Sequence, residues 1–362
     1  MLDRYFLNYQ RQFINIWKKR IILLLLSLLF LVACAQSQLQ EKDLTPKSRL
    51  ELVLKRGKLI CGVNGELPGF SFIDQNGKYS GIDVDFCRAI AAAMFNNPNA
   101  IEYRTLPAVH RFTALKTGEI DILLSNTTWT ISRDTSIGLE FAPIIFYDGQ
   151  GMMVHKGSGI KSLKDMQDST ICVITGTTTE LNLADQMRIR KVSYQPLTFE
   201  EVNVAFSAYQ AGRCTGITTD RSGLVARRML LPRSNDHLIL EDVMSKEPLS
   251  PAVLNGDSRW FDVVKWIVYS TMQAEELGIT SNNLIEQQKS ENIEIRRFLG
   301  IEGEFGKNIG LSNDFTARVI RHVGNYGEIY DHNLGKDSKL NLPRGLNRLW
   351  NGGGLIYSPP FR

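Results

Sequence analysis

The pattern of apolar and polar positions in the first part of the chain predicts strands and helices in turn. The predicted strands lie at 58–63, 100–106 and 120–124. Apolar residues recur at helical spacing after Asp83, which we expect to cap that helix, and a second helix is predicted around 108–116. The apolar positions of the first helix are Val84, Cys87, Ala91 and Met94. Strands that alternate with helices predict a parallel sheet covered by helices.

The same alternation restarts in the middle of the chain. TICVITG, VSYQPL and CTGITTD have the character of strands, and TTTELNLADQMRIR and FEEVNVAFSAYQAG that of helices. This second α/β unit opens near residue 150 and closes near residue 256. The remainder is mostly helical by periodicity and ends in the irregular segment NGGGLIYSPPF. The pattern therefore predicts an α/β protein of two lobes, with a helical C-terminal extension.

The N-terminus has the pattern of an export signal. Basic residues precede the apolar run at 21–33, which is shorter than the ~20 residues that a membrane-spanning helix needs. We interpret 1–34 as a signal peptide and 35–47 as a linker. The sequence LVAC, which ends at Cys34, resembles a bacterial lipobox in which the cysteine carries lipid. Cleavage after Ala35 by an ordinary signal peptidase and an uncleaved anchor are the alternatives.

Charge and composition exclude neither a nucleic-acid nor a membrane partner, but they indicate neither. The 362 residues carry a formal net charge of +4, with 43% hydrophobic and 22% charged residues, as in globular proteins, and suffice for two domains. Lys and Arg form no cluster beyond the N-terminus, whereas nucleic-acid-binding proteins usually gather them on one element. We expect no nucleic-acid partner, and contact with a membrane only through a lipid anchor.

The cysteines beyond Cys34 fit an exported protein. Four cysteines permit three pairings, and an oxidising compartment makes disulfides possible. Bonds between Cys61 and Cys87 and between Cys172 and Cys214 would each close a loop inside one predicted lobe. Buried free thiols are the alternative, because cysteine packs as a small hydrophobic residue.

Three loops that follow predicted strands share one chemical character. They are SNTTWTISRD at 125–134, TGTTTE at 175–180 and TTDRSG at 218–223. Ligands of open α/β sheets bind beyond the carboxyl ends of the strands, where these loops lie. Arg133 suits a carboxylate, because a guanidinium matches it with two hydrogen bonds, and Asp220 suits an ammonium group. Together the loops predict a site for a small zwitterion, an α-amino acid.

Structural explanations exist for each loop taken singly. Thr177 and Glu180 have the spacing of a capping box, Arg133 could pair with Asp134 or Glu140, and Asp220 could form a turn. The chain contains no GxSxG, GxxxxGK[ST] or HExxH motif, and its five histidines have no metal-ligand spacing. We therefore predict no catalytic residue, metal or cofactor.

Several segments resemble the solute-binding proteins of amino-acid ABC transporters, in particular the branch that binds general L-amino acids. They include GIDVDFCRAIAAA, ALKTGEIDILLSNTTWTISRD, GTTTEL, AGRCTGITTDRSGL, EEVNVAFSAYQAGRC, SKEPLSPAV, VGNYGEIY and GLNRLWNGGGLIYSPPFR. The resemblance runs to the last residue. It implies the type II periplasmic-binding fold, a clamshell whose two lobes are joined by two hinge crossovers. Lobe one would combine 48–147 with 257–362, and lobe two would be 148–256.

The resemblance also implies the ligand contacts. The α-carboxylate would be held by Arg133, Thr128 and Thr178, and the α-ammonium by Asp220 with Ser125 and Asn126. Relatives place an aromatic ring over the ligand from the loop after the first strand. Here Leu67 occupies that position, and Phe70 and Trp129 are the other candidates for the role. Glu66 is interpreted as part of the solvated rim.

We therefore expect an extracytoplasmic receptor, monomeric and not an enzyme, that delivers free L-amino acids of broad specificity to a membrane permease. It would lie in the periplasm or at the outer face of the cytoplasmic or outer membrane. An enzyme on the same fold, a dehydratase or a cell-wall lyase, is the first alternative and would need Glu66 or Glu180 as its acid. A sensor module is the second, and would need a signalling domain.

Overall fold

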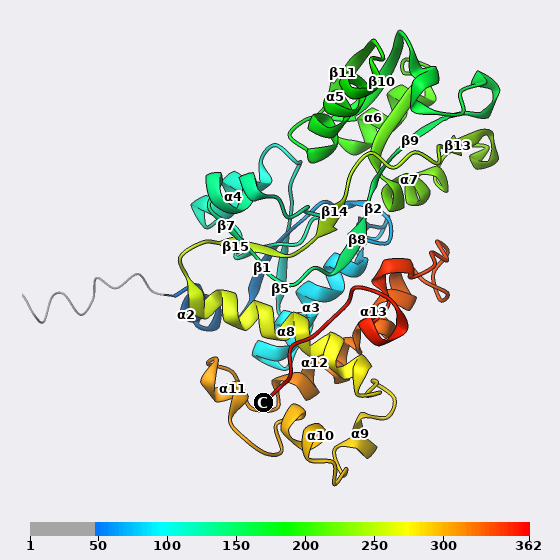
Figure 1. Cartoon of the computed structure of the whole chain (residues 1–362). Helices are drawn as coiled ribbons and strands as arrows, with labels where there is room; N and C mark the ends of the chain where they lie inside the picture. The colour runs from blue at the N-terminus through cyan, green and yellow to red at the C-terminus, as the bar shows by residue number, and fades with distance from the viewer. Residues whose placement is uncertain (1–47) are drawn as a thin grey trace, which may run out of the picture. The chain divides into compact units, whose positions relative to one another are not determined.

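A computed structural model describes residues 48–362, and the first lobe is built on a five-stranded sheet (Figure 1). Its strands, in spatial order, are β5 (Ile101–Thr105), β1 (Leu59–Val63), β6 (Ile122–Leu123), β15 (Ala252–Leu254) and β7 (Leu139–Phe141). β1 runs parallel to β5 and β6, whereas β15 is antiparallel to its neighbours. The predicted parallel sheet therefore forms, with an antiparallel edge.

A second five-stranded sheet forms the other lobe. Its order is β11 (Tyr194–Phe199), β10 (Ser169–Ile174), β12 (Gly216–Asp220), β9 (Gln150–His155) and β13 (His237–Ile239). β10 pairs in parallel with β11 and β12, and β9 is antiparallel to β12 and β13. Both sheets thus place the carboxyl ends of their central parallel strands beside each other, where α/β proteins bind ligands.

Helices cover both sheets. They are α2 (Arg49–Arg56), α3 (Ile82–Phe95) and α4 (Arg111–Thr117) in the first lobe, and α5 (Thr178–Arg190), α6 (Val202–Gln210) and α7 (Arg221–Arg228) in the second. The Ser48 hydroxyl caps α2 by accepting from the Leu50 backbone N–H. The predicted cap of α3 is wrong: the helix begins at Ile82 after Gly81, and Asp83 is buried in its first turn.

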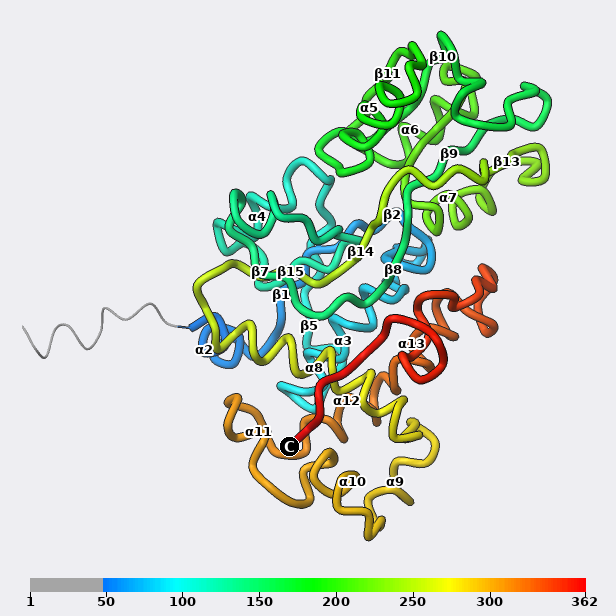
Figure 2. The backbone as a smooth tube through the Cα atoms, in the orientation of Figure 1, coloured from blue at the N-terminus to red at the C-terminus, as the bar shows by residue number. Residues whose placement is uncertain are grey.

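Two neighbouring strands carry the chain between the lobes. β8 (Phe146–Asp148) leads into the second lobe and β14 (Glu247–Leu249) leads back, and the two pair in an antiparallel ladder. Figure 2 shows these two segments side by side between the sheets. β15 follows directly and pairs within the first sheet, although we expected the second lobe to extend to residue 256. The two crossovers implied by the resemblance are present.

The C-terminal helices pack on the first lobe. They are α8 (Ser258–Glu276), α9 (Leu284–Gln287), α10 (Ile293–Phe298), α11 (Phe305–Asn308), α12 (Phe315–Val323) and α13 (Tyr326–Asn333). Their buried residues share one hydrophobic core with α3 and β1. The C-terminal end of the chain also packs on this core, because the Phe361 ring meets the rings of Trp266 and Phe298 edge-on. The extension therefore enlarges the core of lobe one.

Shorter elements complete the described chain. A small sheet consists of β2 (Glu66–Leu67), β3 (Ser71–Ile73) and β4 (Tyr79–Ser80). The single turns of 3₁₀ or π type are η1 (Ser132–Ser136), η2 (Lys156–Ser158), η3 (Leu163–Met166), η4 (Ser234–Asp236), η5 (Gly345–Asn347) and η6 (Trp350–Gly352). η1 is a π turn and carries Arg133, so it bears directly on the site.

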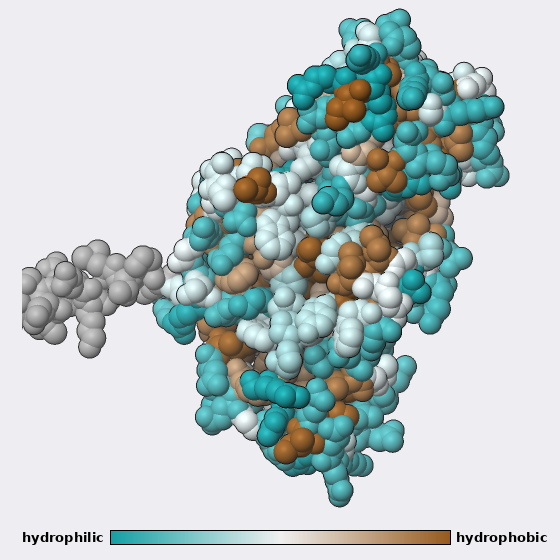
Figure 3. All heavy atoms as spheres, viewed as in Figure 1, coloured by the Kyte–Doolittle hydropathy of each residue, from teal (hydrophilic) through white to brown (hydrophobic). Residues whose placement is uncertain are grey.

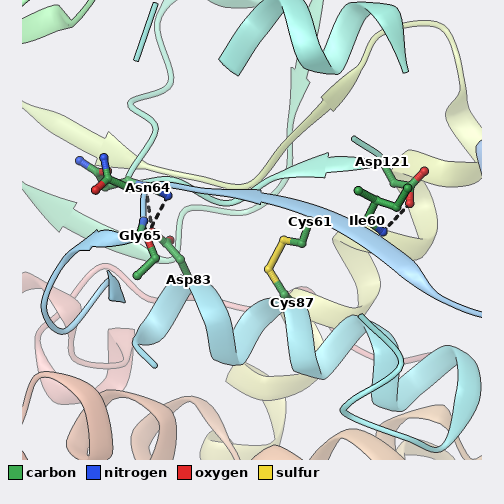
Figure 4. Close-up of a disulfide and its surroundings, with 9 residues drawn as sticks. Ile60, Cys61, Asn64, Gly65, Asp83, Cys87 and Asp121 are labelled. Atoms are coloured by element: carbon green, nitrogen blue, oxygen red, sulfur yellow. Dashed lines mark hydrogen bonds between the residues drawn. A yellow bond between two sulfur atoms is a disulfide. The ribbon is translucent and has the colours of Figure 1, made fainter. Parts of the chain in front are cut away.

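Each lobe contains one disulfide. Cys61 of β1 is joined to Cys87 of α3, with their Cα atoms 6.4 Å apart (Figure 4). Cys172 of β10 is joined to Cys214, which precedes β12, at a Cα separation of 5.6 Å. Each bond ties a central strand to a neighbouring segment of its own lobe.

The described surface is mixed in polarity. On the face shown in Figure 3, apolar side chains occur in small groups separated by hydrophilic ones. Within residues 48–362 no helix has the length and apolar character needed to cross a membrane. The predicted signal peptide at 1–34, the lipidation site at Cys34 and the linker at 35–47 lie outside the described residues.

Candidate functional site

A cavity of about 160 Å³ lies between the two lobes, at the loops that follow their parallel strands. The first lobe lines it with Asn64, Glu66, Thr105, Leu106, Pro107, Ala108, Arg111, Asn126 and Thr128. The second lobe lines it with Ile174, Thr177, Thr178, Thr179, Glu200, Glu201, Val202, Thr219 and Asp220. All three loops selected from the sequence reach this cavity.

Asp220 provides a buried carboxylate at the cavity wall. It ends β12 and precedes α7, and its side chain is 5% exposed. Burial raises the pKa of Asp220 well above its ordinary value, and the charges of Asp148 and Glu247 raise it further. Asn126 Nδ2 of the first lobe donates to Asp220 Oδ2 at 3.3 Å. A cation at this position would stabilise the ionised carboxylate.

Asp83 holds the backbone around Ser125 and Asn126 by a hydrogen bond. The Asn126 N–H donates to Asp83 Oδ2 at 2.9 Å, and burial raises the pKa of Asp83 to about 7. Figure 4 shows Asp83 in the first turn of α3, the helix that also carries Cys87. The Ser125 hydroxyl is buried, has no partner among the described residues, and is not part of the cavity wall. Asn126, but not Ser125, therefore presents its side chain to the cavity.

Arg111 is a cavity residue that the sequence analysis missed. It is buried at the start of α4, and its Nη1 donates to the Ser125 carbonyl at 3.0 Å. Burial lowers the pKa of Arg111 to about 9, with a smaller lowering by Arg133, while Asp220 and Asp83 oppose the shift. Its place after strand β5 is the signal that could have found it, because that loop also faces the cleft.

Arg133 lies behind Thr128 rather than in the cavity wall. Its Nη1 donates to the Thr128 carbonyl at 2.7 Å, and the side chain is buried. Burial lowers the pKa of Arg133 to about 10, while Glu247 and Asp220 oppose this. Arg111 and Arg133 both pack on the Phe112 ring, at 5.0 and 5.1 Å from its centre. The aromatic ring therefore holds two guanidinium groups at the same side of the site.

The predicted carboxylate-binding threonines meet across the cleft. The hydroxyl oxygens of Thr128 and Thr178 are 3.4 Å apart, and both hydroxyls hydrogen-bond to Glu247 Oε2. Thr178 opens α5, whose cap is the Thr177 hydroxyl, which accepts from the Glu180 N–H at 3.2 Å. The helix N-terminus directs backbone N–H groups at the cavity, as anion sites require. Thr177 therefore caps α5, but the reciprocal bond of a capping box is not formed, because the Glu180 carboxylate accepts from the Gly176 N–H instead. The binding role of this loop stays a prediction.

The structure places two of the three predicted side-chain contacts away from the cavity. Phe70 is buried in the first lobe, edge-on to Phe146, and Trp129 is 42% exposed and stacks on Phe141. Neither lines the cavity, because long-range packing within lobe one takes up both rings. Leu67 lines a smaller cavity of about 30 Å³ beside the first, with Ile174, Val202 and Phe206.

Glu66 connects the lobes at the cavity rim. Its carboxylate accepts hydrogen bonds from Asn203 at the start of α6. Arg227 of α7 donates to the Glu66 carbonyl at 3.0 Å and to Asn203 Oδ1 at 2.7 Å. Glu66 thus belongs to the rim, and its hydrogen bonds there also connect lobe one to lobe two. Within residues 48–362, His, Cys, Asp and Glu side chains form no group that could hold a metal ion.

Two α/β lobes, two crossover strands and a polar cavity between the lobes define a protein of the two-lobe ligand-binding class. The model of one family, the bacterial extracellular solute-binding proteins, family 3, matches residues 59–292. The chain belongs to this family.

Similar proteins extend the match to nearly the whole chain. The chain is 50% identical over 312 residues to the general L-amino acid-binding periplasmic protein AapJ of Rhizobium johnstonii. This match covers 86% of this chain and 92% of the relative. It is 48% identical over 316 residues to the glutamate/glutamine/aspartate/asparagine-binding protein BztA of Rhodobacter capsulatus, covering 87% and 94%. The C-terminal extension is therefore shared with these relatives.

A solved structure is similar in fold as well as in sequence. The ABC transporter / periplasmic binding protein from Brucella ovis, with glutathione bound, matches with a TM-score of 0.85 and 47% identity, over 88% of this chain and all of that chain. The expected fold class, the two-lobe clamshell of type II periplasmic-binding proteins with a helical C-terminal extension, is confirmed.

Proposed function

We propose that the protein is an extracytoplasmic receptor that captures free L-amino acids of broad specificity and delivers them to the permease of an ABC transporter. The observation that carries the proposal is the buried carboxylate of Asp220 in one cavity wall with the guanidinium of Arg111 in another. Opposite charges in one small cavity suit a zwitterion. Two relatives, a general L-amino acid-binding periplasmic protein and a glutamate/glutamine/aspartate/asparagine-binding protein, support the same conclusion.

The ligand's two charged groups have distinct partners in this proposal. The α-ammonium lies at Asp220, with the side-chain oxygen of Asn126 as a further acceptor. Ser125 supports the backbone that carries Asn126. The α-carboxylate lies near the guanidinium groups of Arg111 and Arg133. It also lies near the backbone N–H groups at the start of α5, close to Thr128 and Thr178. Charge-assisted bonds contribute ~1.5–3 kcal/mol each, so four of them offset much of the ~4–15 kcal/mol cost of association.

Ligands larger than one amino acid fit the same scheme. Glutathione, which the Brucella ovis structure holds, carries a free α-ammonium and α-carboxylate at its glutamyl end. The cavity continues past Arg111 along 105–108 to the exposed carboxylates of Glu200 and Glu201. An open rim of this kind supports broad specificity, because it places few demands on the rest of the ligand.

The proposed function as a receptor also implies where the protein lies and that it acts as a monomer. We place the mature protein as a monomer in the periplasm, or at the outer face of a membrane if Cys34 carries lipid. We assign 48–145 and 250–362 to lobe one and 149–246 to lobe two, because β15 pairs in the first sheet directly after the return crossover β14. The helical extension braces lobe one, since its core is continuous with α3.

The two acids that the sequence offered for an enzymatic role are both engaged in hydrogen bonds of the fold. Glu66 is engaged by Asn203, and Glu180 accepts from the Gly176 N–H at 2.9 Å. Both carboxylates thus act as hydrogen-bond acceptors within the fold. We therefore propose a binding protein without catalytic activity.

Isothermal titration of the purified protein with a panel of L-amino acids tests the proposal. We expect micromolar or tighter binding of several of them, at least a hundredfold weakening in Asp220→Asn and Arg133→Ala, and a substantial weakening in Arg111→Met. Glu119→Gln, on the exposed surface, is the matched control. Unchanged affinity in both Asp220→Asn and Arg133→Ala would refute the site, and absence of amino-acid binding by the wild type would refute the function.

A further inference from the structure

Glu247 is a buried carboxylate to which neither the sequence nor the resemblance gave a role. It lies on the return crossover β14, and its side chain is 1% exposed. Oε2 accepts from the Thr128 hydroxyl of the first lobe at 2.5 Å and from the Thr178 hydroxyl of the second at 3.0 Å. Oε1 accepts from Asn182 Nδ2 at 2.8 Å and from the Ser245 hydroxyl. One carboxylate thus joins both lobes and the hinge.

Glu247 is part of the framework and does not occupy the cavity as a ligand would. Its backbone pairs with Asp148 in the crossover ladder, and Asn182 and Ser245 hold its second oxygen. It is not among the residues of the cavity wall, whereas Thr128 and Thr178 are. Four donors satisfy the ionised carboxylate, and the charge of Arg133 acts on it from the other side of Thr128.

The chemistry of a hydroxyl group gives this contact a consequence for the ligand. An ionised carboxylate is an acceptor only, and each threonine hydroxyl has a single proton. Since Thr128 and Thr178 donate that proton to Glu247, their lone pairs are directed away from it, toward the cavity. In that state neither hydroxyl can donate to a carboxylate of the ligand.

We infer that Glu247 is a positioning residue that sets the hydrogen-bonding polarity of the carboxylate subsite, an inference that rests on the proposed function. It makes Thr128 and Thr178 acceptors and leaves donation to the guanidinium groups and the backbone N–H groups of α5. Acceptor hydroxyls favour an N–H of the ligand over an oxygen anion. Glu247 therefore moderates the preference of the site for an α-carboxylate over its neutral α-amide.

The ratio of two dissociation constants tests this role. L-glutamate and its α-amide are titrated against the full mature chain in wild type, Glu247→Gln, Thr178→Val and Thr178→Ser. Changes in general stability or closure affect both ligands alike, so the ratio of the amide Kd to the acid Kd reports on subsite polarity. Glu247→Gln replaces one acceptor oxygen by an N–H donor and removes a negative charge, so we expect the ratio to rise about tenfold.

Thr178→Val should change the ratio of the amide Kd to the acid Kd in opposite directions for the two possible roles of the hydroxyl. If the hydroxyl accepts from the ligand, its loss weakens the amide more than the acid, and the ratio rises severalfold. If it donates to the carboxylate, the ratio falls. Thr178→Ser keeps the hydroxyl and should retain the wild-type ratio.

A falling or unchanged ratio in Thr178→Val overturns the inference, as does an unchanged ratio in a folded Glu247→Gln. If Glu247→Gln does not fold, the Thr178 pair decides alone. A wild-type protein that binds neither compound nor any other amino acid instead refutes the proposed function, so the two failures are distinguishable.

Discussion

The Glu66 carboxylate accepts two hydrogen bonds from Asn203 across the cleft, one from the backbone N–H at 3.0 Å and one from Nδ2 at 2.6 Å. Glu66 belongs to the small sheet of lobe one, and Asn203 to the first turn of α6 in lobe two. Arg227 extends the contact by donating to both residues. The two lobes are therefore tied together at the rim, apart from any bond that a ligand would make.

Loss of this rim contact should weaken ligand binding without removing a ligand contact. Asn203→Ala deletes two charge-assisted bonds between partly exposed groups, one to Glu66 and one from Arg227, which together contribute about 1 kcal/mol. We expect an amino-acid Kd about fivefold weaker by calorimetry, and a larger radius of gyration of the ligand-free protein by X-ray scattering. Glu119→Ala should change neither quantity. The rim contact has no role in closure if Asn203→Ala matches the wild type in both.

Amino-acid binding should release protons at every pH at which Asp220 of the ligand-free protein is protonated. Burial, Asp148 and Glu247 raise the pKa of Asp220 in the ligand-free protein, whereas a bound ammonium would lower it. Affinity should therefore fall as the pH falls through the raised pKa of Asp220, well above the ordinary titration range of aspartate. Titrations over a range of pH values, in buffers of different ionisation enthalpy, measure the released protons.

Asp148→Asn is the matched variant for that experiment. Asp148 is half-buried, desolvation raises its own pKa to about 6, and its charge contributes to the raised pKa of Asp220. Its neutral replacement should move the loss of affinity to lower pH. An affinity that is independent of buffer and of pH would show that the ammonium does not bind at Asp220.

Asp83 should make the folded protein less stable at neutral pH than at mildly acidic pH. Burial raises its pKa from 3.8 to about 7, whereas the unfolded chain titrates near 3.9. As the pH falls from 7 to 4 the folded protein takes up a proton that the unfolded chain does not, so this contribution to the unfolding free energy rises. The destabilisation is complete above pH 7.

Asp83→Asn removes that titration and keeps an acceptor for the Asn126 N–H. Urea unfolding at several pH values should show the variant gaining stability relative to the wild type between pH 4 and 8. Glu119→Gln serves as the control with no such trend. A constant difference between Asp83→Asn and wild type across this range would contradict the raised pKa.

Each disulfide should contribute substantially to stability. The bonds span 26 and 42 residues, for which loop-closure entropy gives about 3.5 and 4 kcal/mol. Paired Cys→Ala replacement should lower the unfolding free energy by amounts of this order, measured with denaturant. Thiol titration of the denatured, unreduced mature protein should find none of the four cysteines reactive, and reactive thiols would contradict the pairing.

The local pattern of the sequence predicted the elements and the loops of the site. Short apolar runs bounded by turn residues specify strands such as β10 wherever they are buried, because the run itself is the burial signal. The loops containing Thr128, Thr178 and Asp220 were found because the carboxyl ends of parallel strands face the same cleft. Those three residues line one cavity. Residue type and position along a strand were sufficient information for this part.

The direction of individual side chains was decided by the tertiary structure. Phe70 and Trp129 have the character of ligand contacts, yet Phe146 and Phe141 hold their rings in lobe one. Arg111 enters the cavity from a helix start, and Glu247 reaches both lobes from a strand more than a hundred residues after Thr128. Aromatic packing and shared hydrogen bonds between segments far apart in sequence fix these orientations. Local periodicity specifies which face of an element is buried, but the neighbour that each side chain meets is set when the lobes and crossovers pack together.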